Sequence, residues 1–139
     1  MTSAPDPAVL RGLLDRLSAE RADLARFAAL APGQLADVDR LKAVKYTFVV
    51  AAEVCIDVCH HVIAARGLRA PASFADGFSV LAENGMLDGE LAVSLGDLAR
   101  FRNLLVHGYA DVDDGRVLDI LRTRVVDLDA FSRVAAGFG

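Results

Sequence analysis

Apolar residues recur at helical spacing along nearly the whole chain, and this periodicity constrains the fold more than any other feature of the sequence. One face of a helix returns every three or four residues, whereas a half-buried strand alternates apolar and polar residues. Alternating Val, Ile, Thr and aromatic residues never persist beyond a few positions. The sequence therefore predicts an all-α fold, an up-and-down bundle of four to five helices.

Proline, glycine and capping residues divide this pattern into separate helices. The expected helices are 7–31, 37–66, 73–83, 88–106 and a last one that carries Val117 to Phe131. The second is apolar on most sides between Phe48 and Ile63, which predicts a central helix packed by several neighbours. Gly67 and Gly108 are expected to end helices, and Phe74 is expected to face inward.

Length and composition predict one folded domain over residues 1–139. The chain has 139 residues, of which 54% are hydrophobic and 24% charged. A chain of this size buries about 70% of the surface that its unfolded form exposes, which is enough for a core without disulfides or a structural metal. The net charge of -4 argues against broad, non-specific nucleic-acid binding, so we expect no DNA partner.

The sequence also predicts a cytoplasmic protein with no membrane partner. Residues 1–6 lack the basic region and apolar stretch of a secretory signal, and two cysteines are compatible with the cytosol. The cleanest apolar run, Tyr46 to Ala52, stops at Glu53. This run is far shorter than the roughly 20 residues that a membrane-spanning helix needs.

The segment 102–109 concentrates polar side chains that are able to carry chemistry. It reads Arg-Asn-Leu-Leu-Val-His-Gly-Tyr and places a guanidinium, an imidazole and a phenol at one helix end. Arg102 and Tyr109 nearly share a helix face, whereas His107 would point about 140° from Arg102 if the helix simply continued. A break at Gly108 is expected to let the imidazole swing towards the guanidinium.

A fixed cation beside a histidine suits cleavage of an RNA phosphodiester without a metal. His107 would take the proton of the 2′-hydroxyl while Arg102 holds the phosphate as it becomes pentavalent. The leaving 5′-oxygen needs a second acid, which a two-fold dimer would supply from its other chain. A structural alternative stays open, in which Arg102 caps helix-end carbonyls, His107 is a C-cap and Tyr109 anchors the following loop.

The segment 102–109 matches the R-x4-H-x-Y signature of HEPN-type ribonucleases, with the Asn after Arg that this superfamily favours, and it is most similar to the HepT toxin family. The helix 57–64, Asp-Val-Cys-His-His-Val-Ile-Ala, resembles the D-x-C-x-H helix of that family. Further matches in spacing are Pro71, Phe74, Ala75, Phe78, Leu81 and Gly85. The similarity extends from about Lys45 to Leu128.

The resemblance implies a homodimeric, HEPN-like bundle that acts as a metal-independent endoribonuclease toxin on RNA. Arg102 and His107 match the catalytic residues of the family, and Asn103 would line the site. The partner implied is an MntA-type nucleotidyltransferase antitoxin, and Tyr109 matches the tyrosine that this antitoxin modifies with AMP. No cofactor is implied, and the products should end in 2′,3′-cyclic phosphate because the attacking group is an internal hydroxyl.

Two other functions use the same bundle and stay open at this point. One is a non-catalytic subunit that binds a nucleotidyltransferase and helps to present its substrate, and the other is a purely structural helical dimer. An intact set of Arg102, His107 and Tyr109 favours the ribonuclease, because a binding subunit would not need all three.

Asp57 sits in an apolar helix, where an unpaired buried carboxylate would be costly, so we expect it to meet a cation or to line a cleft. Arg102 is the candidate partner.

Two further clusters are interpreted as structural. Cys55 and Cys59 are one helical turn apart beside two histidines, but consecutive histidines on a helix diverge by about 100°, and zinc needs four convergent ligands. We therefore expect no metal site. The acidic stretch Asp111, Asp113, Asp114 lacks the remaining ligands of a calcium loop, so a solvated loop or a surface for a basic partner is expected.

Overall fold

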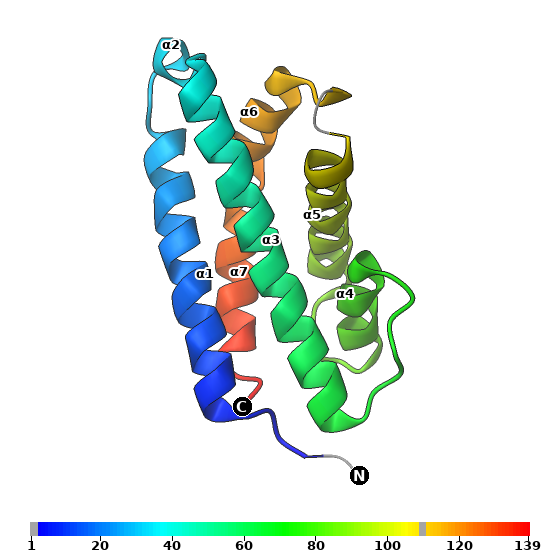
Figure 1. Cartoon of the computed structure of the whole chain (residues 1–139). Helices are drawn as coiled ribbons and strands as arrows, with labels where there is room; N and C mark the ends of the chain where they lie inside the picture. Colours follow the sequence, from blue (N-terminus) through cyan, green and yellow to red (C-terminus); the bar gives the residue numbers. More distant parts are fainter. Residues whose placement is uncertain (1–2, 109–110) are drawn as a thin grey trace.

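The computed structural model describes residues 3–108 and 111–139, and this part of the chain forms seven helices and no strand. The helices are α1 (Pro7–Ala28), α2 (Pro32–Leu35), α3 (Val38–Arg66), α4 (Phe74–Glu83), α5 (Gly89–His107), α6 (Asp114–Thr123) and α7 (Val125–Ala135). In Figure 1, α1, α3, α5 and the α6–α7 pair alternate in direction, so both described chain ends lie at the same end of the bundle. The prediction of an all-α, up-and-down bundle is confirmed.

The helices begin and end largely where the local signals predict. Asp6, Asp37 and Ser73 each accept a hydrogen bond from a backbone N–H two or three residues further on, at 2.9, 3.0 and 3.1 Å. These bonds satisfy amides that lack a partner within the helix. Gly67 closes α3 with a φ of 64°, a left-handed conformation that side chains with a Cβ avoid. The expected starts of the first three long helices are therefore confirmed.

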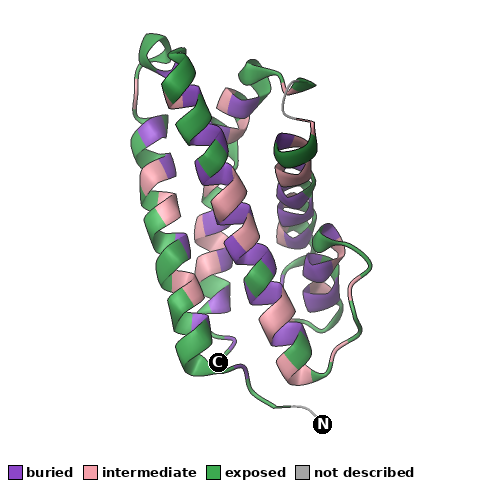
Figure 2. Ribbon diagram, in the orientation of Figure 1, coloured by how far each residue is buried: buried purple, intermediate pink, exposed green. Residues whose placement is uncertain are grey.

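α3 is the central helix, as its apolar sequence predicts. It carries 14 buried residues, and the buried colour recurs along most of its length in Figure 2. Phe48 on α3 meets Phe101 on α5 edge to face, with ring centroids 6.1 Å apart, and Phe78 meets Phe131 at 5.8 Å in the same way. This edge-to-face geometry is favourable beyond the area that the rings bury.

The length and composition of α3 also meet the criterion for a membrane-spanning helix, and α3 is the one helix in residues 3–108 and 111–139 that does so. However, 56% of its most apolar window is buried inside the bundle. The central helix of a helical core meets the same criterion, so the finding is weak evidence for a membrane span.

The last predicted helix is two helices, α6 and α7, which meet at Arg124. Two valines follow Thr123 after Arg124, and the Thr123 hydroxyl donates to the carbonyl of Asp119 at 2.8 Å. β-branched residues favour helix less, and a Thr bonded to the carbonyl four residues earlier bends a helix. The first helix ends at Ala28 rather than Ala31, and α2 adds a single turn before α3.

Asp111, Asp113 and Asp114 are all exposed, in agreement with the expected solvated stretch, and two of them also contribute to the fold. Asp113 caps α6 by accepting a hydrogen bond from Gly115 N–H at 2.8 Å. Asp114 forms a 2.8 Å ion pair with Lys45, a mostly buried lysine on α3. The pair ties the start of α6 to the central helix.

One arginine clamps loop 67–73 onto α4. Arg69 donates two hydrogen bonds to Asp76 at 2.8 and 3.0 Å and two to Glu83 at 2.9 and 2.7 Å. Asp76 also accepts from Ala72 N–H at 2.8 Å. The bonds from Arg69, and then that from Ala72, lower the pKa of Asp76 from an ordinary value of 3.8 to about 2, and the bonds from Arg69 lower the pKa of Glu83.

These lowered pKa values predict that the Arg69 clamp weakens in acid. A carboxylate whose folded pKa is depressed stabilises the fold above its unfolded pKa, and this stabilisation is lost as the pH falls towards its folded pKa. Arg69→Ala should therefore be less stable than the wild type at pH 7, and the difference should narrow between about pH 5 and pH 2. Urea unfolding across this pH range measures it.

The matched control for this experiment is Arg11→Ala, because Arg11 is exposed and forms no ion pair within the described residues. Its stability profile should run parallel to that of the wild type. A constant difference between Arg69→Ala and the wild type down to pH 2 would contradict the clamp.

Candidate active site

Arg102 on α5 is fixed by contacts from three elements. Its Nη2 donates to Glu53 Oε1 on α3 at 2.7 Å, and its Nη1 donates to Asn103 Oδ1 at 3.0 Å. Its Cζ lies 5.5 Å from the ring centroid of Phe74, the first residue of α4, within cation–π range. The side chain is only 15% exposed. Arg102 therefore binds side chains rather than the helix-end carbonyls of the structural alternative.

The expected pairing of Arg102 with Asp57 is wrong, because Glu53 takes that place. Glu53 lies one helical turn before Asp57 on α3, at the level that Arg102 reaches. Asp57 is exposed, so water solvates its carboxylate and no cation is required. Asp57 nevertheless lines the same hollow as Arg102.

His107 is the last residue of α5, and its side chain is exposed. The helix continues through His107, and Gly108 N–H still bonds to the carbonyl of Leu104 at 2.8 Å. The imidazole therefore points about 140° from Arg102 around the helix axis. The expected swing of His107 towards Arg102 is wrong, because α5 keeps its helical geometry through His107 and the break at Gly108 comes too late to turn that residue. Tyr109 lies outside the described residues.

Three hollows follow one another along α3, the first two against α5 and the third mainly against loop 67–73, and we call them together the α3–α5 groove. The first, about 340 Å³, is lined by Lys42, Lys45, Tyr46, Val49, Leu105 and Val106. The second, about 190 Å³, is lined by Glu53, Ile56, Asp57, His60, Phe74 and Arg102. The third, about 740 Å³, shares His60 and Phe74 with the second and also contacts Asn103. The groove thus runs along one face of α3.

Two lysines line the groove beside the end of α5. Lys42 is exposed, whereas Lys45 is mostly buried and is paired with Asp114. With Arg102 they give one face of an acidic protein three cationic side chains. Two of the three are paired with carboxylates, Lys45 with Asp114 and Arg102 with Glu53, so the groove is only partly cationic.

The sequence did not identify Glu53, His60 or Phe74 as site residues. The rings of His60 and Phe74 lie 5.9 Å apart, and Phe74 is 39% exposed, so the expectation that Phe74 faces inward is wrong. A signal for the two α3 residues was present, since Glu53, Asp57 and His60 follow at spacings of four and three and share a helix face. For Phe74 no such local signal exists.

Cys55 and Cys59 face the core and not the groove. Both are buried, and burial raises the pKa of the Cys55 thiol to about 12 and raises that of Cys59 well above its usual value. A metal binds thiolate, so this environment opposes coordination. In residues 3–108 and 111–139, no group of three or more His, Cys, Asp or Glu is placed to hold a metal ion.

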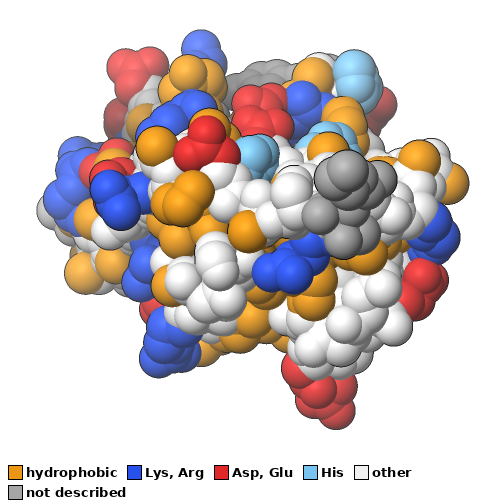
Figure 3. Space-filling view, turned by 90° about the horizontal axis from the view of Figure 1, so that it is seen from below, with side chains coloured by type: hydrophobic (Ala, Val, Ile, Leu, Met, Phe, Trp, Pro, Cys, Tyr) orange, Lys and Arg blue, Asp and Glu red, His pale blue; other side chains and the backbone are white. Residues whose placement is uncertain are grey.

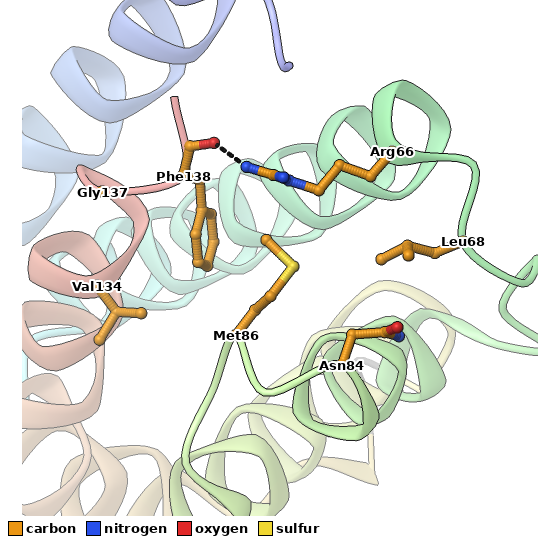
Figure 4. A pocket seen from close by; sticks show the side chains of 7 residues that line it. All are labelled: Arg66, Leu68, Asn84, Met86, Val134, Gly137 and Phe138. Carbon is orange, nitrogen blue, oxygen red and sulfur yellow. Dashed lines mark hydrogen bonds between the residues drawn. The ribbon is translucent and has the colours of Figure 1, made fainter. Parts of the chain in front are cut away.

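A further cavity of about 590 Å³ lies at the end of the bundle where the termini meet. Figure 4 shows Arg66 reaching across it to donate to the carbonyl of Phe138 at 2.9 Å. At the same end, His61 Nε2 accepts a hydrogen bond from Asp6 N–H at 2.9 Å and holds the N-terminal segment. His61 therefore has a structural role. Figure 3 views this end of the bundle and shows acidic, basic and hydrophobic side chains intermixed.

The site and fold define a helical bundle that carries an R-x4-H motif at the end of a helix bordering a partly cationic groove. A family model described as ribonuclease HepT-like matches residues 19–135. The chain therefore belongs to the HepT-like ribonuclease family.

Known proteins resemble this chain in sequence or in fold. The chain is 29% identical over 79 residues to the mRNA nuclease HepT of Shewanella oneidensis, which is 57% of this chain and 59% of that protein. A structure of a tri-AMPylated S. oneidensis HEPN toxin with an MNT antitoxin has a TM-score of 0.84 at 21% identity, covering 91% of this chain and 95% of that one. The cytosolic Bacillus subtilis protein YutE, of unknown function, has a TM-score of 0.84 at 18% identity over 96% and 90%.

Because Glu53 is paired with Arg102 and Asp57 is not, removing the charge of each carboxylate should change the stability of the fold differently. Glu53→Gln keeps the side-chain shape but leaves a mostly buried guanidinium without a carboxylate, so it should destabilise the fold by about 1 kcal/mol. The matched variant Asp57→Asn removes an exposed charge and should change the free energy of unfolding by less than about 0.5 kcal/mol. Urea unfolding measures both, and equal effects would contradict the assignment of Glu53 as the partner.

Proposed function

We propose that this protein is a metal-independent endoribonuclease that acts as a toxin and cleaves RNA in the α3–α5 groove, as a single helical domain over residues 1–139. The observation that carries the proposal is Arg102, which is held rigidly in a hollow of that groove by Glu53, Asn103 and Phe74. The mRNA nuclease activity of the HepT relative and membership of the ribonuclease HepT-like family support it.

The chemistry follows from the imidazole of His107 and the guanidinium of Arg102. His107 accepts the proton of a 2′-hydroxyl, whose oxygen attacks the adjacent phosphorus, and the bond to the 5′-oxygen breaks as that oxygen takes up a proton. The products are a 2′,3′-cyclic phosphate and a 5′-hydroxyl. Arg102 uses one N–H of Nη1 on Asn103 and one of Nη2 on Glu53, and its Nε is buried, so the second N–H of each Nη stays available for the phosphate. Asn103 and Asp57 line the site.

A complete site needs two chains. His107 points away from Arg102 around α5, and one histidine cannot act as base and acid in the same step. A two-fold axis near the end of α5 would bring a second His107 and a second Arg102 into one cleft. We therefore propose a homodimer.

The partner proposed is an MntA-type nucleotidyltransferase antitoxin that transfers AMP to Tyr109. The tyrosine oxygen would attack the α-phosphorus of ATP and pyrophosphate would leave. The added phosphate would lie near Arg102 and His107 in sequence and would repel the RNA backbone. The S. oneidensis toxin that shares this fold is AMPylated and bound to an MNT antitoxin, which supports the proposal. We propose a cytoplasmic location, with neither DNA nor a membrane as partner.

A second candidate is a non-catalytic subunit that binds a nucleotidyltransferase. The same ion pair favours it, because Glu53 offsets the charge of Arg102 and Asp57 adds a further negative charge to the hollow. An assay for cleavage separates the two, since a pure binding subunit would leave RNA intact.

Cleavage of a mixed RNA pool by the purified protein in EDTA is the direct test of catalysis. The wild type should cut, and His107→Ala should be slower by about 10² to 10⁴, the contribution that general acid–base catalysis typically makes. Arg102→Ala should lose activity as well, because the phosphate loses its fixed cation. Mass analysis of the fragments should find cyclic phosphate ends.

The control is Val93→Ala, which truncates an exposed side chain on α5 outside the groove and should keep full activity. Full activity in His107→Ala with unchanged helicity would remove His107 from catalysis. Light scattering on the same preparations reports the number of chains, and a strict monomer that cuts RNA would contradict the two-chain site.

Modification is tested by incubation with an MntA-type nucleotidyltransferase and ATP, followed by intact-mass analysis. The wild type should gain whole AMP units and lose ribonuclease activity, and Tyr109→Phe should gain none. The chain has two tyrosines, so Tyr46→Phe, which removes a 70% exposed phenol, is the matched control and should be modified like the wild type. Modification that depends on Tyr46 would overturn the assignment.

A further inference from the structure

His60 and Phe74 form a wall between two hollows of different chemistry. On one side lies the 190 Å³ hollow with Arg102, Glu53 and Asp57. On the other side lies the 740 Å³ hollow, whose lining is mainly apolar. The two rings stand 5.9 Å apart, and Phe74 is 39% exposed. An aromatic surface is therefore available directly beside the cation that would hold a phosphate.

The larger hollow has the size and lining of a site for a flat organic ring. Its volume of about 740 Å³ lies within the usual range of small-molecule sites. Ile63, Leu68 and Pro71 supply apolar surface, and Ala64 on α3 leaves its rim open. The Arg69 clamp on α4 holds the loop that forms one side, so the hollow exists before anything binds.

Asn103 connects the two hollows and offers a donor of defined orientation. Its Oδ1 accepts a hydrogen bond from Arg102 Nη1 at 3.0 Å, and the side chain lines the larger hollow. Because arginine only donates, this bond assigns the carbonyl oxygen to Arg102 and leaves the Nδ2 amide as the free end. No residue in the described part of the chain accepts from Nδ2. Ring nitrogens and carbonyl oxygens of nucleobases are acceptors that suit it.

We infer that the larger hollow binds one nucleobase of the RNA strand whose phosphate is held at Arg102. Proteins that bind single-stranded nucleic acid combine a cationic track with aromatic side chains on which bases stack. Here both elements share Phe74, and Asn103 adds a hydrogen bond to the base edge. The inference rests on the proposed RNA substrate and adds a subsite to it, with His60 and Phe74 as stacking surface and Asn103 as base donor.

The test fills the hollow without touching the ion pair. Ala64→Trp places a bulky ring at the exposed rim of the hollow, and Ala22→Trp places the same ring on the exposed side of α1, outside the groove. Both variants are made in a His107→Ala background so that RNA stays intact. The probes are a fluorescent hexaribonucleotide and a hexamer of the same length without bases.

The Ala22→Trp protein should bind the hexaribonucleotide about 10-fold or more tightly than the abasic hexamer, as expected for one stacked base. In Ala64→Trp this preference should vanish, while the affinity for the abasic hexamer is unchanged. Phe74→Leu should weaken base-dependent binding, and Phe74→Tyr should retain it. Circular dichroism and light scattering must give equal helicity and chain number for each variant.

Equal base preference in Ala64→Trp and Ala22→Trp would overturn the inference, as would the absence of any preference in Ala22→Trp. The cleavage assay with His107 intact separates this result from the proposed function. If the wild type cleaves RNA but Ala22→Trp shows no preference for the hexaribonucleotide, the base subsite is rejected and the proposed ribonuclease activity is retained. If Ala64→Trp abolishes a base preference but the wild type does not cleave RNA, the proposed ribonuclease activity is rejected and the base subsite is retained. No binding of either hexamer, together with no cleavage by the wild type, rejects both.

Discussion

The burial of α3 on most of its surface is the constraint on which the rest of the bundle depends. A helix with 14 buried residues has to be covered by neighbours, and α1, α4, α5 and α7 pack around it. One strip is left uncovered, and it carries Tyr46, Glu53 and His60 at helical spacing. The α3–α5 groove lies along this strip. The packing that forms the core therefore also places polar side chains of α3 opposite those of α5.

Local signals in the sequence were sufficient for most of the fold but not for the contacts of the site. Asp6, Asp37, Ser73 and Gly67 act within a few residues of the chain, so their roles could be predicted from neighbouring residues alone. The partner of Arg102 lies 49 residues away on another helix. Whether Glu53 or Asp57 meets Arg102 depends on how far α5 is shifted along the axis of α3. The periodicity within each helix carries no information about this shift.

The ion pair between Glu53 and Arg102 has two opposing consequences for an anionic substrate. It fixes the guanidinium, so no side-chain freedom is lost when a phosphate binds. It also offsets part of the positive charge, which weakens attraction to phosphate at a distance. Lys42, an exposed lysine further along the groove, adds positive charge at the end where α5 carries His107, whereas Lys45 is itself paired with Asp114. In the proposed site, Arg102 would orient the phosphate and Lys42 would attract it.

The wall formed by His60 and Phe74 stands between the hollow proposed to bind a base and the hollow proposed to hold the reacting phosphate. His60 and Glu53 are separated by two turns of the same buried helix, and Phe74 contacts both His60 and Arg102. A base held against this wall and a phosphate held at Arg102 would therefore be kept at a fixed separation by a rigid element. The phosphate that meets Arg102 would then depend on which nucleotide fits the larger hollow. In the proposed site, changes at His60 or Phe74 would act first on the choice of cleavage position, whereas changes at His107 would act on the rate of cleavage.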